Sequence, residues 1–131
     1  MIVGIGLDIV DLRRMEAVLD GRTGERFAAR VLTDAERERC SALPKRRAAE
    51  FAAGRFAAKE AVAKALGCGI GAAVGFRDIE VLPDPAGRPV CRLSAKAWLR
   101  LGLAAERYAI HVAITHERNA AAATAIVEQK S

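Results

Sequence analysis

FAAGRFAAKEAVAKALGCG, residues 51–69, is the segment around which the rest of this chain is expected to fold. It consists of small and helix-forming residues, which predict one helix over residues 45–66. Pro44 stands directly before this helix, and Gly67 stands where a glycine suits the C-terminal cap. Because alanine makes up so much of the helix, neighbouring elements are able to pack closely against it.

Four elements are expected on the N-terminal side of this helix. Residues 2–7 (IVGIGL) are apolar and predict a buried strand. Residues 11–20 have the 3-4 spacing of apolar positions that is typical of an amphipathic helix, and a short helix is predicted over residues 25–31. The T-x-x-E pattern at residues 33–36 is a capping box, and it predicts that another helix starts near Asp34.

The C-terminal half changes character, because strand patterns replace most of the helical ones. A hairpin, a helix and a second pair of strands are predicted in turn, over residues 76–82 and 89–93, residues 94–102, and residues 109–115 and 120–128. Helices and strands are mixed without regular βαβ alternation, which indicates an α+β fold with a mostly antiparallel sheet. A chain of 131 residues has the length of one domain, so we expect residues 1–131 to form one.

Composition and charge narrow the class of protein. Hydrophobic residues make up 52% of the chain and charged residues 28%, as in a soluble globular protein. The formal net charge of +5 favours acidic partners, such as nucleic acid, an anionic membrane, a phosphorylated ligand or an acidic protein. Three cysteines without a CxxC pair are typical of free thiols in a reducing cytoplasm, and no apolar run is long enough to span a membrane.

Two acidic residues stand out because their surroundings are otherwise apolar. Asp8 lies in GIGLDIV and Glu60 lies in FAAKEAVAKAL, and a carboxylate is costly to bury unless it is paired or binds a metal. Together they predict one divalent-ion site, to which two distant segments each contribute a ligand. In a simpler interpretation, Glu60 forms a surface ion pair with Lys64. Asp8, like Asp11, is alternatively placed to cap the next helix.

The glycine clusters, the histidines and the basic residues have no single interpretation from the sequence alone. GIG at residues 4–6 lacks the third glycine of a dinucleotide fingerprint, and GCGIG at residues 67–71 follows a helix rather than a strand. His116 is either a strand-end histidine or part of a site, and His111 is a core or surface residue. The basic residues of the first half form either a solvated face or an anion-binding surface; they are Arg13, Arg14, Arg37, Arg39, Lys45, Arg46 and Arg47.

Three segments together resemble the signature regions of a known family. They are GIGLDIVDLRR, FAAGRFAAKEAVAKALGCGIG and HVAITHERNAAAATAIVE, in that order, and they extend over nearly the whole chain. The family is bacterial holo-acyl-carrier-protein synthase, the small-chain type of 4′-phosphopantetheinyl transferase. The resemblance implies transfer of the 4′-phosphopantetheine arm of coenzyme A to a serine of apo-acyl-carrier protein, with release of adenosine 3′,5′-bisphosphate. It also implies a 4′-phosphopantetheinyl transferase fold, in which a mostly antiparallel sheet packs against a long central helix.

The resemblance assigns a role to the two carboxylates. Asp8 and Glu60 match the family's metal-binding positions, and two carboxylates with pyrophosphate oxygens suit Mg²⁺. In this interpretation the ion bridges the pyrophosphate, and either Glu60 or a metal-bound water takes the proton from the incoming serine. Lys64 matches the family lysine one turn further on, so Asp8, Glu60 and Lys64 are the expected catalytic residues.

The same resemblance implies how the two substrates bind. The residues expected to contact coenzyme A are Lys45, Arg46, Arg55, Lys64, Gly67, Gly69 and His116. Arg14 matches an arginine that grips the acidic acyl-carrier protein. Cys68 and Ala113 depart from the family, because each stands where a hydroxyl residue is common. We expect these two departures to have only modest effects on coenzyme affinity.

The family is typically a homotrimer with active sites at its subunit interfaces, so a trimer is expected. The strands over residues 109–115 and 120–128 have few polar residues, and burial around a threefold axis would remove an aggregation hazard. A small basic nucleic-acid-binding module is the alternative. It is disfavoured because the sequence offers neither an aromatic stacking platform nor a base-reading helix, so we expect no nucleic acid as partner. Without a long apolar run, we also expect no membrane as partner.

Overall fold

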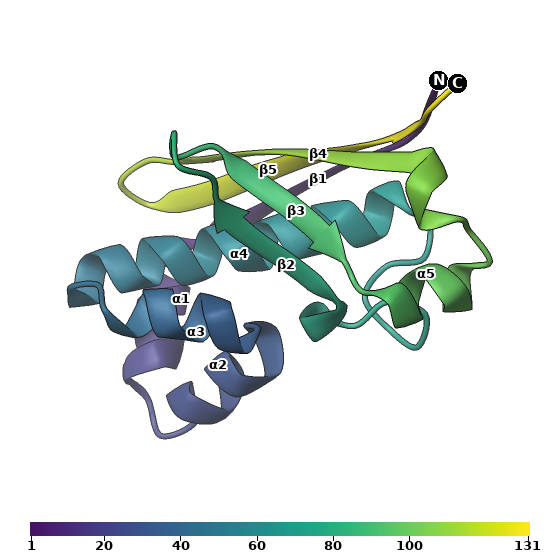
Figure 1. Cartoon of the computed structure of the whole chain (residues 1–131). Coiled ribbons are helices and arrows are strands. Elements are labelled where there is room, and N and C mark those ends of the chain that lie inside the picture. The colour runs from purple at the N-terminus through teal and green to yellow at the C-terminus, as the bar shows by residue number, and fades with distance from the viewer.

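The computed structural model describes residues 1–131, and it consists of helices and two antiparallel sheets (Figure 1). The predicted α+β class is therefore confirmed. In chain order the elements are β1 (Ile2–Asp11), α1 (Leu12–Asp20), α2 (Gly24–Val31), α3 (Asp34–Ser41), α4 (Lys45–Ala65), the 3₁₀ turn η1 (Phe76–Asp78), β2 (Ile79–Pro83), β3 (Pro89–Leu93), α5 (Ala95–Leu101), the 3₁₀ turn η2 (Ala105–Arg107), β4 (Tyr108–His116) and β5 (Ala120–Gln129).

The larger sheet has the strand order β1-β5-β4, so the first strand of the chain lies beside the last. β5 pairs antiparallel with both neighbours, and Ala123 stands opposite Asp8 on one side and opposite Ile114 on the other. The predicted pairing of the last two strands is confirmed. The smaller sheet is the hairpin of β2 and β3, which also matches the expected pair of strands except at its start.

α4 packs on one face of the larger sheet, and two glycines of β1 make this close approach possible. A Cβ atom at Gly4 would overlap the backbone carbonyl of Ala65, and one at Gly6 would overlap that of Ala61. β5 presents small buried side chains to the same core, which are Ala121, Ala123, Ala125 and Val127. The glycines of the GIG segment therefore serve packing, and they bring β1 against the C-terminal half of α4.

The helices begin and end close to the predicted residues. Asp11 caps α1 by accepting hydrogen bonds from the backbone amides of Arg13 and Arg14, at 2.8 and 3.1 Å. Residues 33–36 form the predicted capping box at the start of α3. Beyond α4, Gly67 adopts a φ of +82°, a left-handed conformation that ends the helix and that glycine adopts without a Cβ clash. No helix of this structure combines the length and the hydropathy that crossing a membrane needs.

The first strand of the predicted hairpin begins later than expected. Residues 76–78 form the turn η1 rather than the start of a strand. The cause is a local hydrogen bond, because the Asp78 carboxylate accepts the backbone amide of Gly75 at 2.8 Å and bends the chain there. Only residues from Ile79 onward are free to pair with β3.

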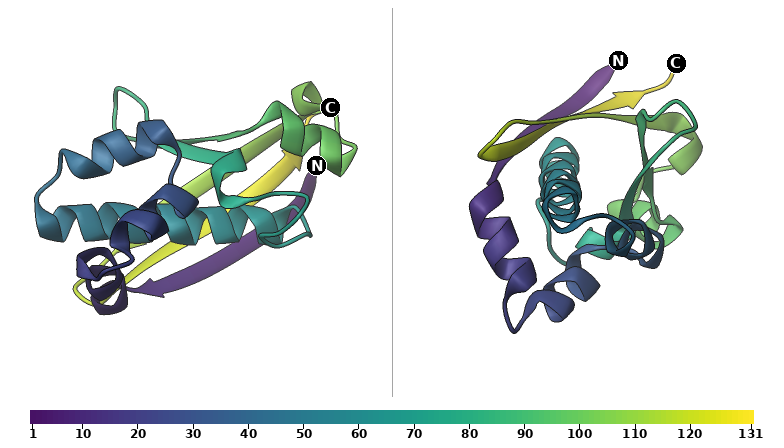
Figure 2. Two further views of the ribbon diagram at one scale, coloured as in Figure 1. Left: turned by 90° about the horizontal axis from the view of Figure 1, so that it is seen from below. Right: turned by 90° about the vertical axis from the view of Figure 1, so that its left-hand side faces the viewer.

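The prediction that residues 2–7 form a buried strand is wrong in one respect. β1 continues to Asp11, and only the side that faces α4 is covered. On the opposite side, the side chains of Ile5, Leu7 and Ile9 are 71%, 62% and 70% exposed. Figure 2 shows the larger sheet with α4 on one side and no element on the other. The chain thus leaves an apolar face of its main sheet open.

Candidate functional site

The two carboxylates singled out in the sequence meet where β1 lies against α4. Asp8 lies in β1, and Glu60 and Lys64 lie one turn apart on α4. The ammonium nitrogen of Lys64 is 3.2 Å from Oδ1 of Asp8. The same nitrogen donates a hydrogen bond to the Leu7 carbonyl oxygen at 3.0 Å. We call Asp8, Glu60 and Lys64 the Asp8 cluster.

The charges in the Asp8 cluster act on one another. Burial raises the pKa of the Glu60 carboxyl above its ordinary value of 4.5, the nearby charge of Asp8 raises this pKa further, and Lys64 opposes both effects. The effect of Asp8 means that two carboxylates repel each other across a short distance. A cation placed between them would relieve that repulsion.

These contacts exclude both of the simpler interpretations. Glu60 and Lys64 form no ion pair with each other, because the ammonium group of Lys64 is turned to Asp8 instead. Asp8 does not cap α1, because that position belongs to Asp11. Glu60 is therefore free of any ion pair, and Asp8 pairs with Lys64 alone.

The donors of the Asp8 cluster fit a hard divalent cation. The chain has no group of three or more His, Cys, Asp or Glu side chains that could enclose a metal ion by themselves. Mg²⁺ does not need such a group, because it keeps several waters and takes further oxygens from the phosphates of a substrate. Two carboxylates that remain partly exposed are sufficient for this kind of site.

A second group of charged side chains meets near the N-terminus of α4, beside the turn between β4 and β5. Nη1 of Arg46 lies 2.8 Å from Oε1 of Glu16, and Nη2 of Arg46 donates a hydrogen bond to the Arg118 carbonyl. Oε2 of Glu50 lies 3.7 Å from Nε of Arg46 and 3.7 Å from Nδ1 of His116. We call Glu16, Arg46, Glu50 and His116 the His116 cluster.

The expected site residues thus form two separate groups in one chain. Glu50 and Glu60 both lie on α4, and their spacing corresponds to ~15 Å along the helix axis. Lys45 lies next to the His116 cluster in sequence but pairs with Asp20 at 2.8 Å. Glu16 and Glu50 are not among the residues that the sequence predicts for a site. The only local signal was the spacing of Arg46 and Glu50, which are four residues apart on one helix face.

Arg55, an expected coenzyme A contact, makes its polar contact elsewhere. Its Nε donates a hydrogen bond to the Val81 carbonyl at 3.0 Å, and its guanidinium lies 4.0 Å from the centre of the Phe51 ring. Burial lowers the pKa of Arg55, and the charge of Glu36 partly restores it. The structure therefore ties Arg55 to the β2–β3 hairpin, and it makes no hydrogen bond or ion pair to either cluster.

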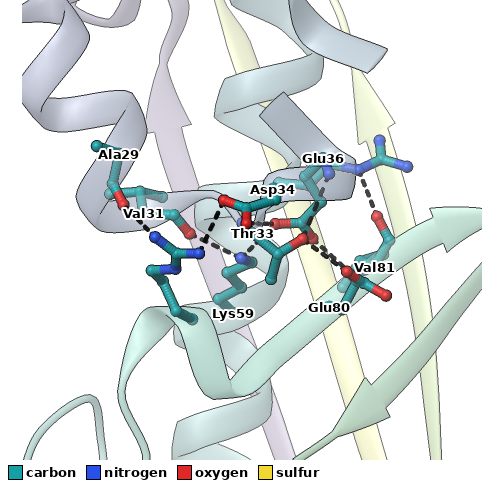
Figure 3. A network of polar contacts seen from close by, with 10 residues as sticks. Ala29, Val31, Thr33, Asp34, Glu36, Lys59, Glu80 and Val81 are labelled. Carbon is teal, nitrogen blue, oxygen red and sulfur yellow. Dashed lines mark hydrogen bonds and ion pairs between the residues drawn. The ribbon is translucent and has the colours of Figure 1, made fainter. Parts of the chain in front are cut away.

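Beside Arg55, a buried ion pair joins α3, α4 and β2 (Figure 3). Nζ of Lys59 lies 2.5 Å from Oε1 of Glu36, and both side chains have no exposed surface. The Glu36 carboxylate also accepts the backbone amides of Thr33 at 2.8 Å and Val81 at 2.7 Å, and Lys59 donates to the Val31 carbonyl. The sequence does not reveal this pair, because the two residues lie in segments that only the tertiary fold brings together.

The glycines that follow α4 turn the chain sharply. Gly67 and Gly69 have φ values of +82° and +64°, and a Cβ atom at either position would meet no other atom within 4 Å. Cys68 stands where a hydroxyl residue is common in the family. Its thiol lies 3.7 Å from the Ala63 carbonyl oxygen, so its hydrogen bond goes to the end of α4. The backbone at Gly67 and Gly69 is therefore uncovered near the C-terminal end of α4.

Arg14 borders an apolar groove between α1, β1 and α4. The groove has a volume of about 290 Å³, and its apolar lining includes Ile9, Met15, Phe27 and Phe56. An adjoining hollow of about 570 Å³ carries two further arginines, Arg26 and Arg30. The first helices therefore offer an apolar surface that is edged by positive charge.

Comparison with known proteins places the chain in a family. Residues 4–125 match the model of the 4′-phosphopantetheinyl transferase superfamily, and the chain belongs to this superfamily. Within it, the chain is 42% identical over 131 residues to holo-[acyl-carrier-protein] synthase of Bacillus cereus (strain AH187). That match covers 100% of this chain and 99% of the relative.

Solved structures give the same result. A holo-(acyl-carrier-protein) synthase from Bacillus anthracis str. Ames, in complex with CoA (3′,5′-ADP), has a TM-score of 0.83 and 41% identity, with 100% of this chain and 99% of that chain covered. Holo-[acyl-carrier-protein] synthase from Neisseria meningitidis has a TM-score of 0.84 and 33% identity, with 98% and 100% covered. The resemblance that the three sequence segments suggested is confirmed.

Proposed function

We infer that this chain transfers the 4′-phosphopantetheine group from coenzyme A to a serine of apo-acyl-carrier protein. The products are holo-acyl-carrier protein and adenosine 3′,5′-bisphosphate. The observation that carries this function is the meeting of Asp8, Glu60 and Lys64 between β1 and α4, in a chain that matches holo-[acyl-carrier-protein] synthases over its whole length. We also propose that residues 1–131 form one transferase domain.

Asp8 and Glu60 are the proposed ligands of Mg²⁺. When bound, the ion supplies positive charge that neutralises the pyrophosphate and the departing bisphosphate. The protein contributes the two carboxylates from β1 and α4, which approach each other closely at Gly4 and Gly6. This arrangement keeps the ligands in place before substrate arrives.

Glu60 and Lys64 carry the remaining chemistry in this proposal. Glu60 is the proposed acceptor for the proton of the incoming serine hydroxyl, because its carboxylate has no ion-pair partner of its own. Lys64 is half exposed, and its ammonium is fixed by Asp8 and by the Leu7 carbonyl. From there it can hold a pyrophosphate oxygen and orient the phosphorus for in-line attack.

The acyl-carrier protein is proposed to dock on the groove beside Arg14. Carrier proteins of this type are acidic, and a groove edged by Arg14, Arg26 and Arg30 offers the opposite charge. The net charge of +5 adds long-range attraction. The groove also lies next to β1, the strand that carries Asp8, so a docked serine would arrive near the Asp8 cluster.

A homotrimer is proposed as the working assembly. The exposed side chains of Ile5, Leu7 and Ile9 form an apolar face that a second copy would cover. Association of copies also offers a way to bring the His116 cluster of one subunit to the Asp8 cluster of the next, because the two are separated within one chain. The three cysteines are free, which fits the reducing cytoplasm that we propose as the location.

The test is a transfer assay on intact protein. Purified protein, apo-acyl-carrier protein, coenzyme A and Mg²⁺ are mixed, and the mass of the carrier protein is measured by mass spectrometry. We expect a gain of one phosphopantetheine arm, which EDTA abolishes and added Mg²⁺ restores. A folded Asp8→Ala or Glu60→Ala variant that retained normal Mg²⁺-dependent transfer would contradict the assignment of the site.

A further inference from the structure

The carboxylate of Glu50 occupies a position that the transferase proposal does not use. One of its oxygens, Oε2, lies 3.7 Å from Nδ1 of His116 and 3.7 Å from Nε of Arg46. The Glu50 side chain is only 22% exposed, whereas those of Arg46 and His116 are 49% and 51% exposed. A largely covered carboxylate thus stands behind two more exposed basic side chains.

Arg46 extends this arrangement to the backbone of the turn after β4. Its guanidinium contacts the carboxylates of Glu16 and Glu50 and also donates to the Arg118 carbonyl. Arg118 lies two residues beyond His116, in the turn between β4 and β5. Side chains of α4 therefore hold the end of β4 that carries His116, in addition to the pairing of β4 with β5.

The contact with Glu50 distinguishes the two nitrogens of the His116 ring. Nδ1 faces the carboxylate, and Nε2 lies on the far side of a ring that is about half exposed, with 51% of the side-chain surface accessible. A carboxylate next to one ring nitrogen favours a proton on that nitrogen. The other nitrogen is then left free to face a ligand.

We propose that Glu50 is a positioning residue, which holds His116 with its proton on Nδ1 and its Nε2 turned outward, where Nε2 accepts a hydrogen bond from a hydroxyl or amino group of coenzyme A. This role rests on the proposed function only in its last step, the contact with coenzyme A. Glu50 itself touches no substrate, and it acts through the ring that it orients. Its second contact keeps Arg46 in the same charged surface.

The orientation of the ring can be tested without any activity. The chain has two histidines, so ¹⁵N NMR of the imidazole nitrogens resolves them, and a His111→Ala variant assigns the signals. For neutral His116 in the wild-type protein, we expect the proton on Nδ1. His111 is an internal contrast, because its Nε2 lies 2.9 Å from Oε1 of Glu128 and should carry the proton instead.

Substitution of Glu50 then tests whether its carboxylate determines the tautomer of His116. Glu50→Ala should shift the His116 proton towards Nε2 and leave the signals of His111 unchanged. The matched control is Glu16→Gln, which removes a carboxylate partner of Arg46 but none of His116. This control should leave the His116 tautomer as in the wild-type protein. A His116 proton on Nε2 in the wild-type protein, or a tautomer unaffected by Glu50→Ala, would overturn the proposal.

Kinetics of phosphopantetheine transfer test the last step. We expect Glu50→Ala to lower kcat/KM for coenzyme A roughly tenfold, by analogy with loss of the partner of a metal-binding histidine. In a His116→Ala background the same change should have little further effect, because the two residues act as one unit. Fully additive losses would overturn the role of Glu50 in coenzyme binding. If wild-type protein shows no transfer at all, the proposed function fails, while the NMR result still decides how the ring is held.

Discussion

The ammonium of Lys64 lies 3.2 Å from Oδ1 of Asp8, and this contact joins α4 to β1 at the point where the two carboxylates meet. It leaves Glu60 without an ion-pair partner, although Lys64 is only one helical turn away. Glu60 thus lies beside a carboxylate and has no basic group of its own. The arrangement keeps positive charge in the cluster while one carboxylate remains free.

Lys64→Met is expected to separate activity from stability. The Lys64 side chain is half exposed, so loss of its ion pair should change the melting temperature little. Loss of its charge should lower kcat/KM for transfer by at least tenfold, because the pyrophosphate of coenzyme A then loses a charge-assisted hydrogen bond. Arg77→Met is the control, since it removes a similarly exposed ion pair with Asp34 at 2.9 Å. Equal losses of activity in both variants would contradict a specific role for Lys64.

Glu60→Gln should stabilise the protein at neutral pH when no metal ion is present. The folded protein holds the Glu60 proton more tightly than the unfolded chain, because the pKa is raised above 4.5. Stability therefore falls as the pH rises from the unfolded pKa through the raised folded pKa, and the glutamine variant avoids this loss. Thermal melts from pH 3 to pH 8 should show the two curves together at low pH and the variant higher at pH 7. Saturating Mg²⁺ should stabilise the wild-type protein more than the variant.

The buried pair of Lys59 and Glu36 makes a stability prediction. Lys59→Met leaves the Glu36 carboxylate without its charged partner in a site with no exposed surface, and we expect a loss of about 3–5 kcal/mol in the free energy of unfolding. Urea denaturation measures this loss. Glu25→Gln is the control, because Glu25 forms an exposed pair with Arg37 at 3.9 Å. A change at Lys59 as small as the change at Glu25 would show that the buried pair contributes little.

Leu7→Glu tests the proposed trimer. Leu7 is 62% exposed on the open face of the larger sheet, and a charge there would have to be buried when copies associate. We expect the variant to sediment as a monomer in analytical ultracentrifugation, whereas the wild-type protein sediments as a trimer. Leu99→Glu changes another exposed leucine, on α5, and should leave the assembly intact. A monomeric wild-type protein would contradict the proposed assembly directly.

Arg14→Glu tests the proposed docking of the acyl-carrier protein. Reversal of charge at the edge of the apolar groove should raise KM for the carrier protein more than tenfold, while KM for coenzyme A stays nearly unchanged. The difference should shrink at high salt, because screening weakens attraction between surface charges. Lys96→Glu makes the same change of net charge on α5 and should have a small effect. Equal increases in both KM values for Arg14→Glu would argue against the docking surface.

Local signals predicted most of the elements correctly. The capping box of residues 33–36, the glycine after α4 and the paired strands near the C-terminus depend on hydrogen bonds and periodicity within a few residues. The error at residues 76–78 has a similar origin, because one carboxylate bonds a nearby amide and overrides the alternating pattern. The exposed face of β1 was not predicted, since an apolar run does not reveal which of its sides is covered.

The order of residues alone indicates the family of this chain, and it predicts Asp8 and Glu60 as a pair of metal ligands. These conclusions depend on residue types and on spacing along the chain, which folding does not alter. The partner of Lys64, the burial of Lys59 with Glu36 and the placement of Glu50 behind His116 became visible only in the folded molecule. Each of these contacts joins segments that are remote in the chain, and the packing of α4 on the sheet brings them together.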